Sequence, residues 1–388
     1  MKYSHYSFVA AAAILPTVVD AHTIFTTLFI NDVSQGDGTC VRMNMDPQHC
    51  TDPIAGLDSD DMACGVDGEK SVAFTCPAPA GGKLTFEWRT WADAEQPGSI
   101  DISHKGPCAV YAKQVKDMDT GSAAGPGWIK LWEEGYDESS GKWCTEKLID
   151  NNGLMSIDIP KSLPGGSWLF RPELLALHQA DKGDPQFYTG CAQVFIKSEK
   201  TAPLNVPAEY SVSIPGYVEA GQPAVTFNIY QPKFPYPMPG PKVYKPAESK
   251  KAAAFTLAST SSKTQKQTEG EIPSDYLIKN ANWVGVEVSS YSTEDGCWKA
   301  SEECYSQANG CYESAPPTGS ANCRTWESKC DGISAACSAG DFNGPPNKGQ
   351  KLQNEDPAPP ENIPATIDVS SSRKMRARRA RALISGFS

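Results

Sequence analysis

Histidine is scarce in this sequence, so its positions are the first place to look for metal chemistry. The 388 residues include five histidines, and four of them follow an apolar leader: His22, His49, His104 and His178. His22 comes directly after Val19-Asp20-Ala21, a stretch that fits a signal-peptidase cleavage site. Cleavage there would make His22 the first residue of the processed chain.

A histidine at the start of a chain offers a metal two nitrogen atoms from one residue. Its α-amine, with an ordinary pKa of about 7.7–8.0, can lose its proton and bind beside the imidazole. His104, in DISHKGPCAVY, could supply a third nitrogen, because Gly106-Pro107 predicts a turn just before a strand. A planar set of nitrogen ligands favours copper. Taken alone, however, His104 fits an ordinary loop histidine better than a ligand.

The stretch HQADKGDPQFYTGCAQVFI holds a second group of polar side chains. Gln186 and Tyr188 are two residues apart, so in an extended segment both face the same side. The Tyr188 hydroxyl could approach a metal, while His178 and Gln186 could donate hydrogen bonds to a small oxygen species. By itself, Tyr188 is more typical of a buried aromatic in an ordinary strand.

Residues 1–21 have the short basic start and apolar centre of a secretory signal peptide, and the apolar run is too short to span a membrane. All 13 cysteines lie beyond Ala21, which favours an oxidising compartment. Their odd number leaves at least one thiol unpaired within the chain. We therefore expect a soluble, secreted, extracellular protein that works as a monomer.

The charge distribution limits the partners. The formal net charge is −11, and a basic tail over residues 373–381 contributes +6, which leaves −17 for the rest. Such an acidic body is repelled by nucleic acid and by anionic membranes, so neither is an expected partner. A neutral polymer, gripped by flat aromatic surfaces, is more compatible with this charge.

Short segments rich in β-branched and aromatic residues recur between Gly, Pro and Asp clusters from residue 22 to about 246. In one of them Leu84, Phe86 and Trp88 alternate with polar residues, the period of a half-buried strand. Many short strands with frequent turns predict an all-β sandwich or barrel with long loops.

The remainder divides by composition into a Ser/Thr/Lys-rich linker at 247–275, a Cys-rich module at 276–340 and a disordered basic tail at 341–388. In the module, two trios of cysteines are each spaced by seven residues, two turns of a helix. This spacing predicts a helical hairpin laced by the pairs Cys297–Cys337, Cys304–Cys330 and Cys311–Cys323, one of 15 possible pairings. The module could be a stapled spacer or could bind a cell-wall polymer.

Several motifs occur together in one order: HTIF at the processed terminus, SHKGP, and FRPELLALH followed by QFY and CAQ. Together they closely resemble the fungal lytic polysaccharide monooxygenases of auxiliary activity family nine, formerly glycoside hydrolase family sixty-one. The resemblance covers about residues 22–246 and implies an immunoglobulin-like β-sandwich. Because DSDDMACG also matches the family pattern, it implies a disulfide between Cys64 and Cys191.

The resemblance implies that His22 and His104 hold one copper ion, with Tyr188 as its axial residue. It assigns His178 and Gln186 to positioning the oxygen species, and it places Tyr236, in YPMPGPKVY, against a sugar ring. The implied substrate is cellulose, a β-1,4-glucan, with other β-glucans as further candidates. Dioxygen or hydrogen peroxide would be the co-substrate, and a small phenol, ascorbate or a redox protein would donate electrons.

Two features depart from the family pattern. Cys108 follows SHKGP where an aliphatic residue is common, and Cys144 is a candidate partner for it. The C-terminal module is also unlike the small aromatic-faced cellulose-binding module often attached to these enzymes.

Three alternatives stay open at this stage. A glycoside hydrolase would need two carboxylates at a set separation, and no pair stands out among 46 acidic residues. A non-catalytic protein that binds copper or wall polysaccharide could use the same histidines. Zinc on three histidines is the third alternative.

Overall fold

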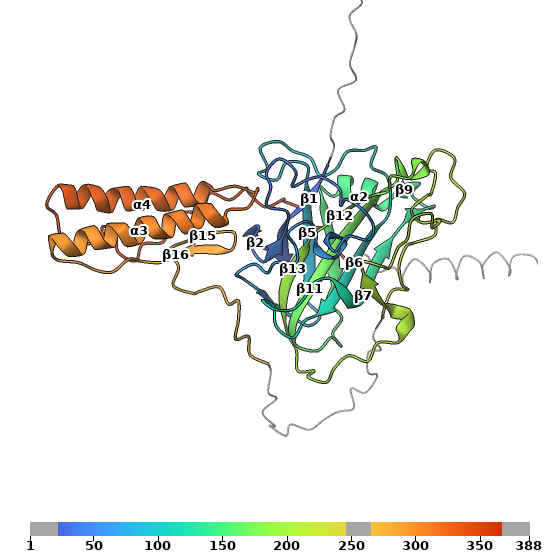
Figure 1. Ribbon diagram of the computed structural model, residues 1–388, viewed down its shortest axis with the longest axis horizontal. Coiled ribbons are helices and arrows are strands. Elements are labelled where there is room, and N and C mark those ends of the chain that lie inside the picture. Colours follow the sequence, from blue (N-terminus) through green and yellow to red (C-terminus); the bar gives the residue numbers. More distant parts are fainter. Residues whose placement is uncertain (1–21, 246–264, 367–388) are drawn as a thin grey trace, which may run out of the picture.

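The computed structural model describes residues 22–245 and 265–366, and its centre is a sandwich of two β-sheets (Figure 1). The four-stranded sheet has the order β10 (Leu154–Asp158), β5 (Lys83–Arg89), β1 (Ile24–Ile30) and β2 (Val33–Asp37). The main path of the larger sheet is β14 (Ser211–Ile214), β7 (Gly125–Glu134), β6 (Cys108–Gln114), β11 (Gly166–Ala176), β13 (Cys191–Lys197) and β3 (Val41–Arg42). The all-β sandwich expected from the sequence is confirmed.

Shorter elements complete the sandwich. β12 (Gln186–Thr189) pairs with β11, and β4 (Cys76–Pro79) pairs in parallel with β13. The loops also carry α1 (Asp61–Cys64), α2 (Cys144–Asp150) and the small ribbon of β8 (Tyr136–Asp137) and β9 (Lys142–Trp143). No helix within the described ranges is long and apolar enough to cross a membrane.

Strand β5 is buried on both faces rather than on one. Leu84, Phe86 and Trp88 face the core, as the alternating pattern predicts. Thr85 and Glu87 on the opposite face are buried as well. Glu87 can be buried because it takes part in an internal ion cluster. The alternation of apolar and polar residues along the strand does not reveal this cluster.

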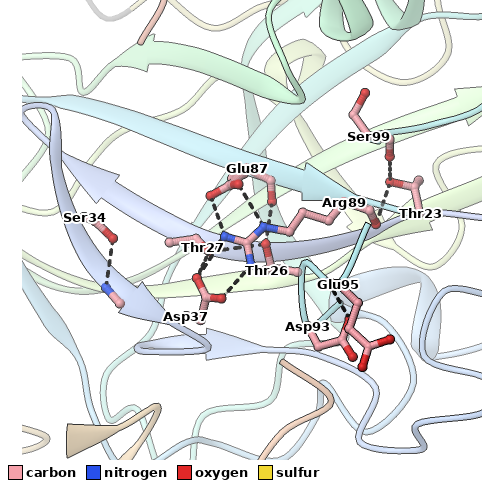
Figure 2. Close-up of polar contacts among 11 residues, drawn as sticks. Thr23, Thr26, Thr27, Ser34, Asp37, Glu87, Arg89, Asp93, Glu95 and Ser99 are labelled. Carbon is pink, nitrogen blue, oxygen red and sulfur yellow. Dashed lines mark hydrogen bonds and ion pairs between the residues drawn. The ribbon is translucent and has the colours of Figure 1, made fainter. Parts of the chain in front are cut away.

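Figure 2 shows this ion cluster, in which the guanidinium of Arg89 joins Asp37 of β2 to Glu87 of β5. Arg89 Nη1 lies 2.5 Å from Asp37 Oδ2, and Arg89 Nε lies 2.8 Å from Glu87 Oε1. Each of the three side chains is less than a tenth exposed. Bidentate contacts to both carboxylates satisfy the buried charges and link β5 to the edge strand β2 across β1, which lies between them.

All six disulfides lie in the described residues, and Cys50 is the unpaired thiol. In the sandwich, Cys64 pairs with Cys191, in agreement with the family resemblance. The other two bridges there are Cys40–Cys76 and Cys108–Cys144. The last of these ties the start of β6 to α2.

The C-terminal module is the expected helical hairpin, α3 (Glu294–Ser314) and α4 (Ala321–Ser338), beside the ribbon of β15 (Ile278–Asn280) and β16 (Trp283–Gly285). The three predicted cysteine pairs are confirmed. Trp326 fills the core between the helices and the ribbon. Asn282 connects the module to the sandwich, because its side chain bonds to the backbone of Gly38 and Cys40.

Two segments expected to lack structure are partly ordered. In the predicted linker, Gln267 is buried and donates a 2.8 Å hydrogen bond to the carbonyl of Thr75. In the predicted tail, Asp356 bonds Asn322, and the carbonyl of Pro364 accepts a hydrogen bond from Lys83. These long-range contacts order two segments whose polar composition predicts disorder. The expectations for 1–21, 247–264 and 367–388 concern positions outside the described residues.

We predict that Arg89→Met lowers the free energy of unfolding by about 3–5 kcal/mol, because it leaves two buried carboxylates without a cation. Urea unfolding followed by circular dichroism measures this loss. The matched control, Asp37→Asn/Glu87→Gln/Arg89→Met, removes all three charges and should lose less. A triple variant no more stable than Arg89→Met would contradict the charge argument.

Candidate metal centre

His22 and His104 are brought together by contacts on the residues beside them. Next to His22, the Thr23 hydroxyl donates a 2.5 Å hydrogen bond to the carbonyl of Ser99 (Figure 2). Ser99 begins the segment that leads to His104, whose backbone N–H donates to the carbonyl of Asp101. The residue before β1 and the residue that approaches β6 are thereby held at one end of the sandwich.

The turn after His104 requires a glycine. The N–H of Gly106 donates a 2.9 Å hydrogen bond to Thr145 Oγ1, and a Cβ at Gly106 would lie only 1.8 Å from the carbonyl oxygen of Leu175. Leu177 N–H also donates to the carbonyl of Lys105. No larger residue fits at position 106, so the histidine-bearing loop is packed tightly against the end of β11.

Tyr188 of β12 lies close to both histidines. Its ring centroid is 6.3 Å from that of His22 and 6.0 Å from that of His104. The ring is 1% exposed, and the hydroxyl donates a 2.9 Å hydrogen bond to Oε1 of Gln186. The side chains of Gln186 and Tyr188 therefore meet, as their spacing in an extended strand predicts.

His178 completes the cluster from the loop that follows β11. Its ring centroid is 4.2 Å from that of His104. Nδ1 of His178 is buried and has no hydrogen-bond partner within residues 22–245 and 265–366. A buried ring nitrogen without a partner is costly, and it is the kind of exception found at functional sites.

Both inner histidines are held neutral. Burial, reinforced by the neighbouring His178, lowers the pKa of His104 to about 4, and Asp101 opposes the shift only in part. Burial also lowers the pKa of His178. Near neutral pH both imidazoles therefore lack the extra proton, and the neutral imidazole is the form that binds metal ions.

The residues fit a metal only if the chain supplies a ligand beyond its side chains. In the described part of the chain, no three His, Cys, Asp or Glu side chains are grouped so that they could hold a metal ion. His22 and His104 supply two imidazoles, and the α-amine of a chain cut before His22 would supply the third nitrogen. Nδ1 of His22 lies 3.1 Å from Asp52, so this carboxylate would compete for the ring.

The assignment of Tyr236 to sugar stacking is wrong. Tyr236 is 9% exposed, and its hydroxyl donates a 2.8 Å hydrogen bond to the carbonyl of Ala224. Its ring packs edge-on against Trp143 and Phe227 in the buried cluster on the outer face of the larger sheet. A ring enclosed by other aromatic residues cannot receive a polymer.

Sequence reasoning missed two residues near the cluster. Tyr230 is 65% exposed, and its hydroxyl donates a 3.2 Å hydrogen bond to the carbonyl of His178. Asp52 contacts both His22 and the exposed His49. Tyr230 ends a segment whose sequence predicts a strand. Nothing in the sequence distinguishes it from the other tyrosines, and only its position in the fold places it near the cluster. The HxxD spacing of His49 and Asp52 was the one available signal for Asp52.

Comparisons with known proteins agree with this fold. The family model for Auxiliary Activity family 9 (formerly GH61) matches residues 22–236. AA9 family lytic polysaccharide monooxygenase H of Botryotinia fuckeliana is 52% identical over 351 residues, covering 89% of this chain and 79% of that protein. AA9 family lytic polysaccharide monooxygenase C of Aspergillus tamarii is 50% identical over 341 residues, covering 86% and 90%. The solved structure CvAA9A has a TM-score of 0.51 and 34% identity, covering 57% of this chain and 98% of its own.

Titration of the metal-free protein checks the environment of His104. Its pKa should be about 4, whereas that of exposed His49 should be raised above 6.5 by the hydrogen bond to Asp52. In the unfolded chain the pKa of His104 has its ordinary value of 6.5, so between pH 6.5 and pH 4 the unfolded chain binds a proton there and the folded chain does not. The free energy of unfolding therefore falls as the pH drops from 6.5 to 4. His104→Asn should flatten this slope in urea unfolding. An NMR-measured pKa of His104 at or above 6.5 would refute the burial argument.

Proposed function

From the premise that this chain belongs to Auxiliary Activity family 9, and is therefore an enzyme of the lytic polysaccharide monooxygenase type, we propose that it is a secreted copper oxidoreductase that cleaves cellulose. The observation that carries the proposal is the convergence of His22, His104 and Tyr188 at one end of the sandwich. The catalytic domain would extend from residue 22 to about 246, and residues 276–340 would form a separate module.

The proposed ligands are the imidazoles of His22 and His104 together with the α-amine of His22. Removal of residues 1–21 would create the amine ligand, so processing would complete the site. Bound copper would supply one-electron chemistry toward dioxygen or hydrogen peroxide, drawing on an external donor such as ascorbate, a small phenol or a redox protein. The neutral state of His104 supports ligation, because no proton has to be displaced.

Tyr188, Gln186 and His178 would set the surroundings of the metal. Gln186 Oε1 accepts a hydrogen bond from the Tyr188 hydroxyl, which fixes the direction of that hydroxyl. With Nδ1 buried, Nε2 is the atom of His178 able to hold or pass a proton at the edge of the site. These roles are positioning and proton handling, and they rest on the close contact of the His178 and His104 rings.

Cellulose is proposed as the substrate because it is neutral and flat. An acidic body with a formal charge of −17 outside the basic tail would repel an anionic polymer. Tyr230 supports docking near the site, because its exposed ring is anchored through its hydroxyl to the backbone of His178. An anchored aromatic ring offers a sugar a flat apolar surface at little entropic cost.

We predict that a variant with one glycine added before His22 binds copper(II) about 100-fold more weakly than the mature chain, or worse, because the α-amine of His22 becomes part of a peptide bond. Loss of an outer-sphere partner already weakens metal binding by about 10–100-fold, and loss of a direct ligand should cost at least the upper value. Its oxidised sugar products from swollen cellulose, with ascorbate, should fall below detection in mass spectrometry. The control Lys161→Ala alters an exposed side chain beyond β10, at the opposite end of the sandwich from His22, and should behave as the mature chain.

Equal copper affinity and equal products from the extended variant would refute the amine as a ligand. Native oligosaccharides without oxidised ends would instead favour hydrolysis. Copper binding without any soluble product from cellulose would favour another polymer or a binding role.

Tyr230 and Tyr236 should respond differently to truncation. Tyr230→Ala should leave stability within about 0.5 kcal/mol and reduce binding to cellulose by about threefold to tenfold. Tyr236→Ala should lower the free energy of unfolding by about 3–5 kcal/mol through the cavity it leaves. Binding isotherms and urea unfolding separate the two effects. A stable Tyr236→Ala that binds cellulose poorly would reverse the assignment.

A further inference from the structure

Helix α3 carries three aromatic residues in a line. Trp298, Tyr305 and Tyr312 are spaced by seven residues, which places them on one face at intervals of about 10.5 Å. Each follows a cysteine of the disulfide ladder, so the line runs beside the buried seam between the helices. We call these three residues the aromatic stripe.

The disulfide ladder does not explain the aromatic stripe. The residues that follow the three cysteines of α4 are Arg324, Asp331 and Ser338, all polar. Trp298 and Tyr312 are each 39% exposed, and they are the only large apolar side chains of α3 and α4 in the described structure with so much exposed surface. Tyr305, between them, is half-buried and packs against the core of the module. Large apolar surface kept in a row on a small module indicates a binding role.

Helix α4 fixes the tyrosines of the aromatic stripe. The hydroxyl of Tyr305 donates a 2.6 Å hydrogen bond to Asp331 Oδ1, and that of Tyr312 donates a 2.7 Å hydrogen bond to Glu327 Oε2. Each ring is therefore held at both ends, by its helix and by a carboxylate of the neighbouring helix. The same carboxylates leave oxygen lone pairs beside the rings, where hydroxyl groups of a ligand could donate.

We propose that the aromatic stripe is a binding surface for the chains of insoluble cellulose, an inference that rests on the proposed function for its choice of polymer. Aromatic rings stack on the apolar faces of pyranose rings, and their regular interval is comparable with a disaccharide unit of an extended β-1,4-linked chain. Residues 294–338 hold seven acidic and three basic side chains, which disfavours anionic polymers and nucleic acid.

The aromatic stripe lies outside the candidate metal centre. The hairpin projects from the side of the sandwich that carries β2 (Figure 1), and its attachment runs through the backbone of Gly38 and Cys40. Binding there would hold the enzyme on its solid substrate without occupying the histidine cluster. The module is then an anchor, which raises the local concentration of substrate at the site.

The test compares full-length mature protein with Trp298→Ala/Tyr312→Ala in adsorption isotherms on microcrystalline cellulose. The double variant should bind about tenfold more weakly or worse, because two stacking rings are lost. The matched control Lys299→Ala/Ser306→Ala changes two exposed residues of the same helix, about a quarter-turn away, and should bind normally. Trp298→Phe/Tyr312→Phe keeps the rings and should retain most of the binding. Melting temperature and disulfide mapping confirm that each variant is folded.

Equal adsorption of the wild type and the folded double alanine variant would overturn the inference. So would a loss of binding to chitin alone with cellulose binding intact, because that outcome assigns the stripe to a different polymer. Copper affinity should be the same in all variants. If the wild type binds cellulose through the stripe but yields no oxidised sugars, the proposed function fails while the binding surface stands.

Discussion

The hydrogen bond from the Thr23 hydroxyl to the carbonyl of Ser99 is the contact on which the candidate metal centre depends. His22 precedes a strand of the small sheet, whereas His104 precedes a strand of the large sheet, so the sandwich alone does not bring them together. The Thr23–Ser99 bond joins the segment before β1 to the loop that carries His104. Both of its partners are buried, so water cannot readily replace it.

Other features of the sandwich support this contact. The Arg89 ion cluster links β5 to the edge strand β2, and the carbonyl of Arg89 also faces the Thr23 hydroxyl (Figure 2). On the other side, the disulfide Cys108–Cys144 and the bond from Gly106 to Thr145 join the loop of His104 to α2. The histidines are thus carried by loops whose ends are fixed by covalent and buried polar contacts, as a preorganised site requires.

Sequence patterns predicted the features that depend on local periodicity. The cysteine pairs of the hairpin followed from a seven-residue spacing on two helices, and the meeting of Gln186 with Tyr188 followed from the two-residue period of a strand. Features set by long-range packing were not predictable in this way. Tyr236 is enclosed by Trp143 and Phe227 from other segments, and Asp356 reaches Asn322 only because the chain folds back.

The central claim is that one copper ion is held by three nitrogen atoms, two of them from the first residue of the processed chain. Electron paramagnetic resonance of the mature protein loaded with copper(II) tests it most directly. We expect one copper per chain with hyperfine coupling to three nitrogens, reduced by one in His104→Ala. Coupling to fewer than three nitrogens in the mature chain, or a spectrum unchanged by His104→Ala, would rule out this set of ligands.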